Sequence, residues 1–308
     1  MNSIESLRMD FRMQVKELGK INNDKISDDL IFVGSGDSYV AGLMVEYVTG
    51  HKCACYGPSD LLNSKFDESK TYCFISVTGK TKSNINVARR ATEQGVNTIA
   101  VTMNPYSKLA HVCKDIVPLD LKRTAFPNSS FTVFTANVVT CLQIAGVSVP
   151  QKFDVWYNRG VELSQKFLDS KTLLDAINEN TVFILGNNML YPLAVYTSLK
   201  MTEFFGTTSV AHKLEEFCHS PVFGIKKSHR LCVLGQQEEP VAIKLGESGL
   251  KVFYIELSNE DNLSQLFESI FFVQNLMLHL AEKHGYRDLN YLMMKDVLNA
   301  SSDIIYSE

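Results

Sequence analysis

The feature that most constrains the fold is an alternation of short apolar runs with longer helix-like stretches, which the chain repeats in its two halves. The first half has five such runs, at residues 30–34, 52–56, 72–77, 97–103 and 115–120. The second half has four, at residues 181–188, 207–212, 229–235 and 250–257. Strands that alternate with helices form parallel sheets covered by helices. The sequence therefore predicts an α/β protein of two doubly wound, flavodoxin-like units in tandem, related by an internal duplication.

The limits of these units follow from the stretch between the two halves. A long apolar helix over residues 129–146 closes the first half, and the proline in VSVPQKFD (147–154) then marks a boundary. We predict an N-terminal helix and first unit at residues 1–150, a second unit at 151–284, and a C-terminal tail at 285–308.

Composition excludes several classes of protein. The chain has 308 residues, 45% hydrophobic content and a net charge of −4, which is typical of a globular protein of about two domains. The mild acidity and the lack of a Lys/Arg block argue against a nucleic-acid partner. No run of about 18 apolar residues predicts a membrane span, and the N-terminus lacks a signal-peptide core, so we expect a cytoplasmic protein with no membrane partner.

The seven cysteines are scattered, mostly inside apolar runs. Free cysteine packs there as a small hydrophobe. The Cys53-Ala-Cys55 motif has no second ligand pair nearby, so buried thiols are favoured over a metal site. We expect no disulfide, no metal and no cofactor.

Two turns after apolar runs have the character of anion-binding sites. In FVGSGDSYVAG (32–42) a glycine turn leads into a helix, and such a turn can direct backbone N–H groups at an anion. It lacks the lysine of a P-loop and the full spacing of a dinucleotide fingerprint, and a turn needed only for strand–helix packing is the alternative. In SVTGKTKS (76–83) four hydroxyl side chains lie at a helix N-terminus, where ordinary capping would account for one or two.

These motifs together resemble the sugar isomerase (SIS) domain family. GSGDSYVAG and SVTGKT, with TANVV after a serine-rich turn, are similar to the family patterns GxGxSxxAG and S[QRV]SGxT. In the second half, GNNMLYPLAVYTSLKMTE and LEEFCHSP resemble GRGxxYPxAxEGALKxKE and ELKHGP of the isomerase half of glucosamine-6-phosphate synthase. The stretch from Asp288 to Val297 is similar to the acid, apolar and lysine positions of that family's tail. The resemblance runs from about residue 30 to the C-terminus.

The resemblance implies a sugar-phosphate substrate and a set of residues that hold it. The substrate's phosphate is expected on Ser76, Thr78 and Thr81, with Ser38 in the same cavity. The remaining expected substrate-binding residues, which come from the same two turns, are Gly36, Asp37, Val77 and Gly79.

Moving a proton between C2 and C1 of an open-chain sugar requires a base that spans both carbons, for which a carboxylate is suited. The resemblance implies Glu203 as this base and His219 as the ring-opening group, sixteen residues apart here as in the family. Without the motifs, a solvated helix carboxylate and a loop histidine would be the simpler interpretation. Lys200, on the same helical face as Glu203, either favours the ionised glutamate or forms a surface ion pair. The resemblance also implies that the C-terminal tail closes over the active site, where Lys295 would contact the sugar carbonyl or hold a developing negative charge. A disordered tail is the alternative.

Because of departures from the family pattern, the sequence does not determine which sugar phosphate is the substrate. They lie around the expected sugar more than around the phosphate, and comprise Val77, Ala125, Thr132, Asn187, Asn188, Tyr196 and Thr202. The synthases take ammonia from a glutaminase domain with an N-terminal cysteine, and this chain begins Met1-Asn2-Ser3. We therefore predict a glucosamine-6-phosphate deaminase or aldose–ketose isomerase. A fructosamine-6-phosphate deglycase and a non-catalytic sugar-phosphate-binding regulator are the alternatives. The resemblance also implies a homodimer in which His219 reaches the neighbouring subunit's site.

Overall fold

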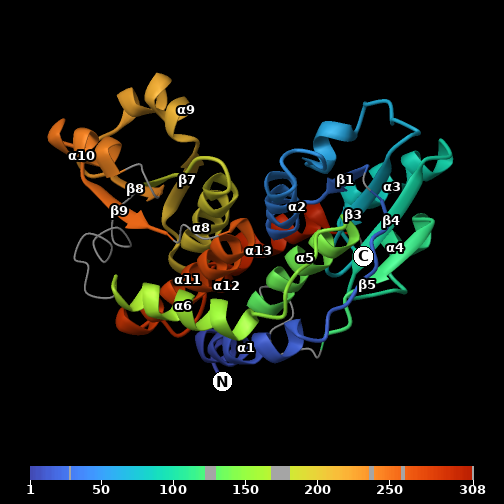
Figure 1. The fold of residues 1–308 in the computed structure, drawn as a ribbon, viewed down its shortest axis with the longest axis horizontal. Coiled ribbons are helices and arrows are strands. Elements are labelled where there is room, and N and C mark those ends of the chain that lie inside the picture. The colour runs from blue at the N-terminus through green and yellow to red at the C-terminus, as the bar shows by residue number, and fades with distance from the viewer. Residues whose placement is uncertain (28, 122–129, 168–180, 236–238, 258–260, 307–308) are drawn as a thin grey trace. The chain divides into compact units, whose positions relative to one another are not determined.

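The computed structural model describes residues 1–308 except 28, 122–129, 168–180, 236–238, 258–260 and 307–308. The chain forms two compact units (Figure 1). The five-stranded unit consists of residues 12–151 and 295–308, and the four-stranded unit of residues 1–11 and 152–294. Helix α1 (Ser3–Leu18) therefore contributes to both units, and the last residues of the chain belong to the five-stranded one.

The sheet of the five-stranded unit is parallel throughout. Its strand order is β2-β1-β3-β4-β5, the order of flavodoxin-like sheets. Each of the five predicted apolar runs contains one strand: β1 (Leu30–Val33), β2 (Ala54–Tyr56), β3 (Thr71–Ile75), β4 (Asn97–Thr102) and β5 (Asp115–Pro118). The central strands are buried almost without interruption, as parallel strands covered on both faces are.

The helices of this unit follow the strands in sequence. They are α2 (Asp37–Val48), the short η1 (Pro58–Leu61), α3 (Lys82–Glu93), α4 (Lys108–Val112), α5 (Phe131–Ile144) and α13 (Lys295–Ile305). Helix α5 is apolar all round and almost completely buried. All seven cysteines of the chain are free, and burial raises the pKa of thiols such as Cys73 far above its usual value. The buried thiols are therefore packing groups rather than nucleophiles, whereas Cys218 is exposed.

The sheet of the four-stranded unit is also parallel, with the order β7-β6-β8-β9. Its strands are β6 (Thr181–Leu185), β7 (Thr208–His212), β8 (Arg230–Gly235) and β9 (Val252–Glu256). This order repeats that of the first four strands of the other sheet, which supports the predicted duplication. The helices are α6 (Phe153–Gln165), α8 (Leu190–Phe205), α9 (Leu214–His219), η2 (Pro221–Gly224), α10 (Glu239–Glu247), α11 (Asn262–Lys283) and α12 (Asn290–Met293).

Helices α6 and α11 form the tightest helix pair of this unit. Trp156 stacks on Phe267 at a centroid distance of 4.8 Å, and its indole N–H donates to Ser264 Oγ at 3.0 Å. The backbones approach closely at Gly160, where an added Cβ would lie 2.6 Å from the carbonyl oxygen of Glu268. Glycine at this position therefore sets how near the two helices can lie.

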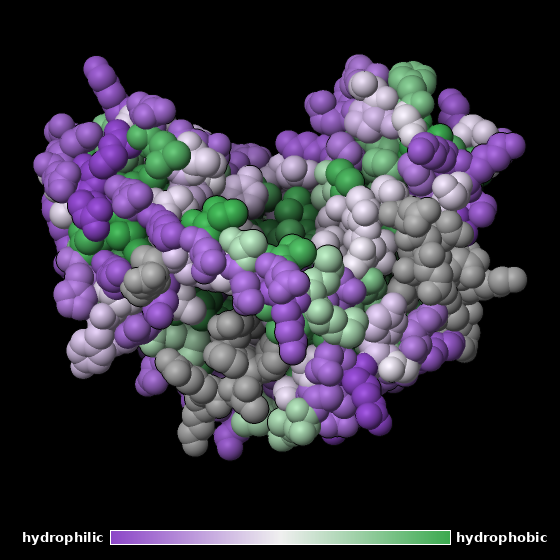
Figure 2. All heavy atoms as spheres, turned by 180° about the vertical axis from the view of Figure 1, so that it is seen from behind, coloured by the Kyte–Doolittle hydropathy of each residue, from purple (hydrophilic) through white to green (hydrophobic). Residues whose placement is uncertain are grey.

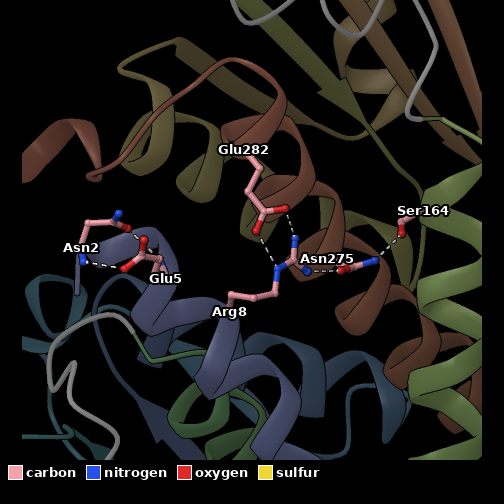
Figure 3. Close-up of polar contacts among 6 residues, drawn as sticks. All are labelled: Asn2, Glu5, Arg8, Ser164, Asn275 and Glu282. Atoms are coloured by element: carbon pink, nitrogen blue, oxygen red, sulfur yellow. Dashed lines mark hydrogen bonds and ion pairs between the residues drawn. The ribbon is translucent and has the colours of Figure 1, made fainter.

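The first turns of α1 are anchored to α11 within the four-stranded unit (Figure 3). Arg8 forms an ion pair with Glu282 at 2.8 Å and donates to Asn275 Oδ1 at 2.6 Å. Asn275 in turn donates to Ser164 Oγ of α6 at 2.7 Å. The start of α1 is also capped by Asp288, whose Oδ1 accepts from the backbone N–H of Ser3 at 2.9 Å and whose pKa these hydrogen bonds lower.

Hydrophilic residues cover most of the face of the protein that Figure 2 shows. Within the described residues, no helix combines the length and the apolar character needed to cross a bilayer.

Candidate functional site

The turn between β3 and α3 brings two of the predicted phosphate ligands together. Ser76 is 4% exposed, and its hydroxyl lies 3.2 Å from the hydroxyl of Thr81. Thr81 is the N-cap residue of α3, yet its hydroxyl makes no capping hydrogen bond. An N-cap threonine normally accepts from the first backbone N–H groups of its helix, which otherwise have no partner inside the helix. Because Thr81 faces Ser76 instead, these N–H groups remain available for an anion.

The backbone of this turn directs its carbonyl groups away from the helix end. The carbonyl oxygen of Val77 accepts from Thr102 Oγ1 and from the N–H of Met103, both at 3.1 Å. The carbonyl oxygen of Gly79 accepts from the N–H of Leu109 at 3.2 Å. These bonds tie the carbonyl dipoles to β4 and α4. The negative ends of the dipoles therefore do not oppose an anion at the start of α3.

Thr78 and Gly79 have mainly conformational roles in the turn. Thr78 Oγ1 accepts from the N–H of Lys80 at 3.3 Å, so one lone pair of this predicted ligand is used locally. Gly79 has a φ of 64°, and an added Cβ would lie 2.0 Å from Ser107 Oγ. The turn is thus packed so closely on the β4–α4 connection that only glycine fits.

Asn84 holds the end of β3 next to this turn, and the sequence analysis did not predict this role. This side chain is 1% exposed and donates through Nδ2 to the carbonyl oxygen of Ile75 at 2.9 Å, which fixes α3 against the residue before Ser76. Its Oδ1 is buried and accepts no hydrogen bond from the described residues. No sequence signal distinguishes this asparagine from an ordinary residue of the first helical turn.

The glycine turn between β1 and α2 borders a hollow of about 300 Å³. Gly36 has a φ of 56°, and an added Cβ there would meet no atom within 4 Å, because the residue faces this open space. The hollow is lined by hydroxyl, phenol, carboxylate and glycine groups: Gly34, Ser35, Gly36, Tyr39, Gly57, Pro58, Ser59, Asp60 and Ser83. Of the predicted substrate-binding residues, the lining includes Gly36 alone. Ser38 is buried in the first turn of α2, and Asp37 begins that helix.

The predicted catalytic pair lies on α8 of the four-stranded unit. Lys200 Nζ is 2.7 Å from Glu203 Oε2, and the side chains are 1% and 29% exposed. The ammonium also lies 5.4 Å from the ring centroid of Tyr196, whose hydroxyl accepts from Gln274 Nε2 at 3.2 Å. The surface ion pair considered from the sequence is therefore wrong, since Lys200 is a buried cation. Its contacts hold one oxygen of a carboxylate that is still partly open to solvent.

The packing of α8 agrees only in part with its apolar pattern. Leu193 and Met201 are buried, whereas Val195 and Leu199 are half-buried. The departure at Tyr196 is fully buried and occupies the position under the Lys200 ammonium. This tyrosine therefore belongs to the surroundings of the ion pair.

His219 lies at the end of α9 and is highly exposed. Its side chain is 74% exposed, and its ion-pair partner is Glu215, 3.7 Å away. The start of α9 is held by Asn187, whose Oδ1 accepts from the N–H of Leu214 at 3.1 Å. This departure from the family motif therefore orients the helix that carries the histidine.

The remaining predicted residues belong to the five-stranded unit. Lys295 is exposed and begins α13. Thr132 is buried in α5, and Ala125 lies outside the described residues.

No protein-family model matches the chain. A curated relative, the isomerizing glutamine–fructose-6-phosphate aminotransferase of Clostridium tetani, is 25% identical over 264 residues. The match covers 78% of this chain and 42% of that protein, so the chain spans less than half of its relative's length. Among solved structures, glucosamine-6-phosphate deaminase of Thermotoga maritima has a TM-score of 0.72 at 19% identity, over 92% of this chain and 96% of that one.

The C-terminal domain of glucosamine-fructose-6-phosphate aminotransferase from Francisella tularensis has a TM-score of 0.71 at 15% identity, over 91% and 96% of the two chains. The chain has the phosphosugar isomerase fold. Phosphosugar isomerases are also among the structural neighbours, which confirms the family resemblance predicted from the motifs.

Proposed function

We propose that the protein converts an amino-sugar 6-phosphate by enolisation at C1 and C2, as a glucosamine-6-phosphate deaminase or aldose–ketose isomerase. The phosphosugar isomerase fold and the names of its relatives support the substrate class. The observation that carries the proposal is the Lys200–Glu203 pair, a carboxylate held by a buried ammonium and still 29% exposed.

In this proposal the phosphate binds at the start of α3. The facing hydroxyls of Ser76 and Thr81 donate to phosphate oxygens, and Thr78 and Ser38 complete the predicted set. The first N–H groups of α3 and the positive end of its dipole add to the attraction for a dianion. The outward-turned carbonyl groups of Val77 and Gly79 keep the site free of opposing dipoles.

Glu203 would act as the general base. One carboxylate oxygen is held by Lys200, and the other removes the proton from C2 and returns it to C1. The buried ammonium favours the ionised carboxylate by simple charge attraction. His219 would open the sugar ring by proton transfer, and Lys295 would stabilise negative charge that develops on the sugar oxygen.

Glu203→Gln tests this assignment. The change preserves side-chain size and removes the basic oxygen, so turnover should fall by about 10²–10⁴-fold while sugar-phosphate affinity changes only a few-fold. Exchange of the substrate's C2 hydrogen in heavy water, followed by NMR, measures the proton step directly. Glu247→Gln on the exposed surface of α10 is the matched control and should keep wild-type exchange. Wild-type exchange in Glu203→Gln would show that another group carries the proton.

The released product decides between the proposed reaction and its alternatives. A deaminase releases ammonia from glucosamine 6-phosphate, an isomerase converts ketose to aldose without release, and a deglycase releases an amino acid from a fructosamine 6-phosphate. A panel of these phosphosugars should give the first or second result. Binding of a phosphosugar without conversion of any of them would favour the non-catalytic regulator.

A further inference from the structure

The last residues of α13 contact the same turn that carries the proposed phosphate ligands. Tyr306 forms an antiparallel β-bridge with Thr81. One residue further along α3, Lys82 Nζ donates to the carbonyl oxygen of Asp303 at 2.5 Å. Both partners belong to the five-stranded unit. These contacts lie beyond the stretch from Asp288 to Val297, whose individual residues match the family's tail.

Helix α13 packs only weakly on the rest of its unit, so the contacts at its C-terminal end matter for its attachment. Helix α13 has eleven residues and none of them is buried. Ile304 is 74% exposed and Val297 is 59% exposed. An isolated helix of this length is marginal in water. The bridge to Thr81 and the bond from Lys82 therefore contribute to the docking of α13.

The same bridge holds the residue whose hydroxyl faces Ser76. Thr81 has the extended backbone usual for an N-cap residue, with φ −64° and ψ 113°, yet it directs its hydroxyl to Ser76 rather than to its own helix. The bridge to Tyr306 fixes this backbone in the extended region, so it limits how far Thr81 can move relative to Ser76. Tyr306 is 43% exposed, and partial burial of its side chain raises the pKa of its hydroxyl.

We propose that Asp303 and Tyr306 are positioning residues that clamp the turn at Thr81, so that docking of the tail and binding of a phosphate at this turn favour each other. This inference rests on the proposed function for the location of the phosphate. The coupling is reciprocal: whatever factor the docked tail adds to ligand affinity, the ligand adds to tail docking. Couplings between sites commonly lie at about 5–150-fold in affinity.

Two variants remove the clamp by different means. A chain that ends at Ile305 lacks the bridge, and Lys82→Met lacks the bond to Asp303. Arg89→Met, on the exposed surface of the same helix, is the matched control for loss of a cation. Calorimetric Kd values for inorganic phosphate and glucosamine 6-phosphate should rise about fivefold or more in both variants and stay unchanged in Arg89→Met. Circular dichroism at the start of each titration verifies that each variant is folded.

Hydrogen exchange of residues 295–306 provides the reciprocal measurement. In the wild-type chain, saturating glucosamine 6-phosphate should slow exchange in α13 by a factor similar to the loss of affinity in the truncated chain. A direct contact of Lys82 with the phosphate would weaken binding without this protection, and the absence of protection overturns the clamp.

A Ser76→Ala/Thr81→Ala double variant separates this inference from the proposed function. If the double variant loses phosphate affinity while the truncated chain keeps it, the proposed phosphate site is correct and the proposed role of Asp303 and Tyr306 is wrong. If the double variant keeps wild-type affinity, or the wild-type chain does not bind either ligand, the phosphate site and the clamp are both wrong. Tighter binding by the truncated chain would make the tail a competitor of the ligand and would also overturn the proposal.

Discussion

Single residues of the turn between β3 and α3, the proposed phosphate site, show how backbone geometry and chemistry are linked. Gly79 allows the positive φ that turns its carbonyl group toward the N–H of Leu109, and its missing side chain admits Ser107. Thr81 leaves its helix uncapped so that its hydroxyl faces Ser76. The missing cap costs local stability and leaves backbone N–H groups at the start of α3 available for a ligand.

Gly79→Ala should combine two costs. A non-glycine residue in the left-handed region costs about 1–2 kcal/mol, and the clash with Ser107 should add about 1–3 kcal/mol of overpacking. Gly95→Ala is the matched control because Gly95 also has a positive φ, 85°, but an added Cβ there meets no atom within 4 Å. Urea unfolding of both variants measures the difference. Equal losses would show that the Ser107 contact does not limit the turn.

At the scale of elements, α6 and α11 show how helix packing depends on small side chains. The stacked pair Trp156–Phe267 and the ion pair of Arg159 with Glu268 at 2.9 Å flank the close approach at Gly160. An added Cβ at Gly160 would meet backbone atoms of α11, which cannot move aside as the end of a side chain can. The contact between α6 and α11 therefore tolerates no larger side chain at Gly160 without movement of a helix.

Gly160→Ala and Gly246→Ala should have opposite effects on stability. The first forces α6 and α11 apart and should lower the free energy of unfolding by about 1–3 kcal/mol. The second lies in α10, where an added Cβ meets nothing within 4 Å, so it should raise that free energy by about 0.5–1 kcal/mol through lower backbone entropy of the unfolded chain. Thermal unfolding of the two variants measures whether each change raises or lowers the free energy of unfolding. A stabilised Gly160→Ala would mean that the helices can separate at no cost.

At the scale of the whole molecule, the proposed functions are divided between the two units. The five-stranded unit carries the phosphate turn, and the four-stranded unit carries Glu203 and His219. His219 is highly exposed, and its ion pair with Glu215 is long at 3.7 Å. Such a side chain is accessible to a second copy of the chain. We propose a homodimer in which His219 serves the neighbouring subunit.

A mixture of His219→Ala and Glu203→Gln chains tests this proposal. Each homodimer would lack one catalytic group at every site, whereas a mixed dimer would hold one site with both groups intact. The mixture should therefore recover up to about half of the wild-type activity per mixed dimer, given a catalytic contribution of about 10²–10⁴-fold from each group. Two different affinity tags isolate the mixed dimers. Isolated mixed dimers without activity, or a monomer in sedimentation, would place both groups in one chain.

The sequence by itself determined the strands and the local turns, but not the helices α12 and α13 of the expected tail. Buried parallel strands are nearly continuous apolar runs, so the nine strands of the described residues were visible in the pattern. The glycine and hydroxyl turns that follow β1 and β3 depend on residues close together in the chain. The family motifs then pointed to the phosphosugar isomerase fold, which the structural neighbours confirm.

Only the tertiary structure decided which side chains are buried, paired or exposed. Lys200 was ambiguous in the sequence, because whether a lysine lies at the surface depends on what packs against its helix, here Tyr196. Asn84 gained its role from the carbonyl group of Ile75, and Asp303 and Tyr306 gained theirs from contacts with α3 more than 220 residues earlier in the chain. Periodicity and propensity report on neighbours in the chain, whereas these contacts arise only when distant segments fold together.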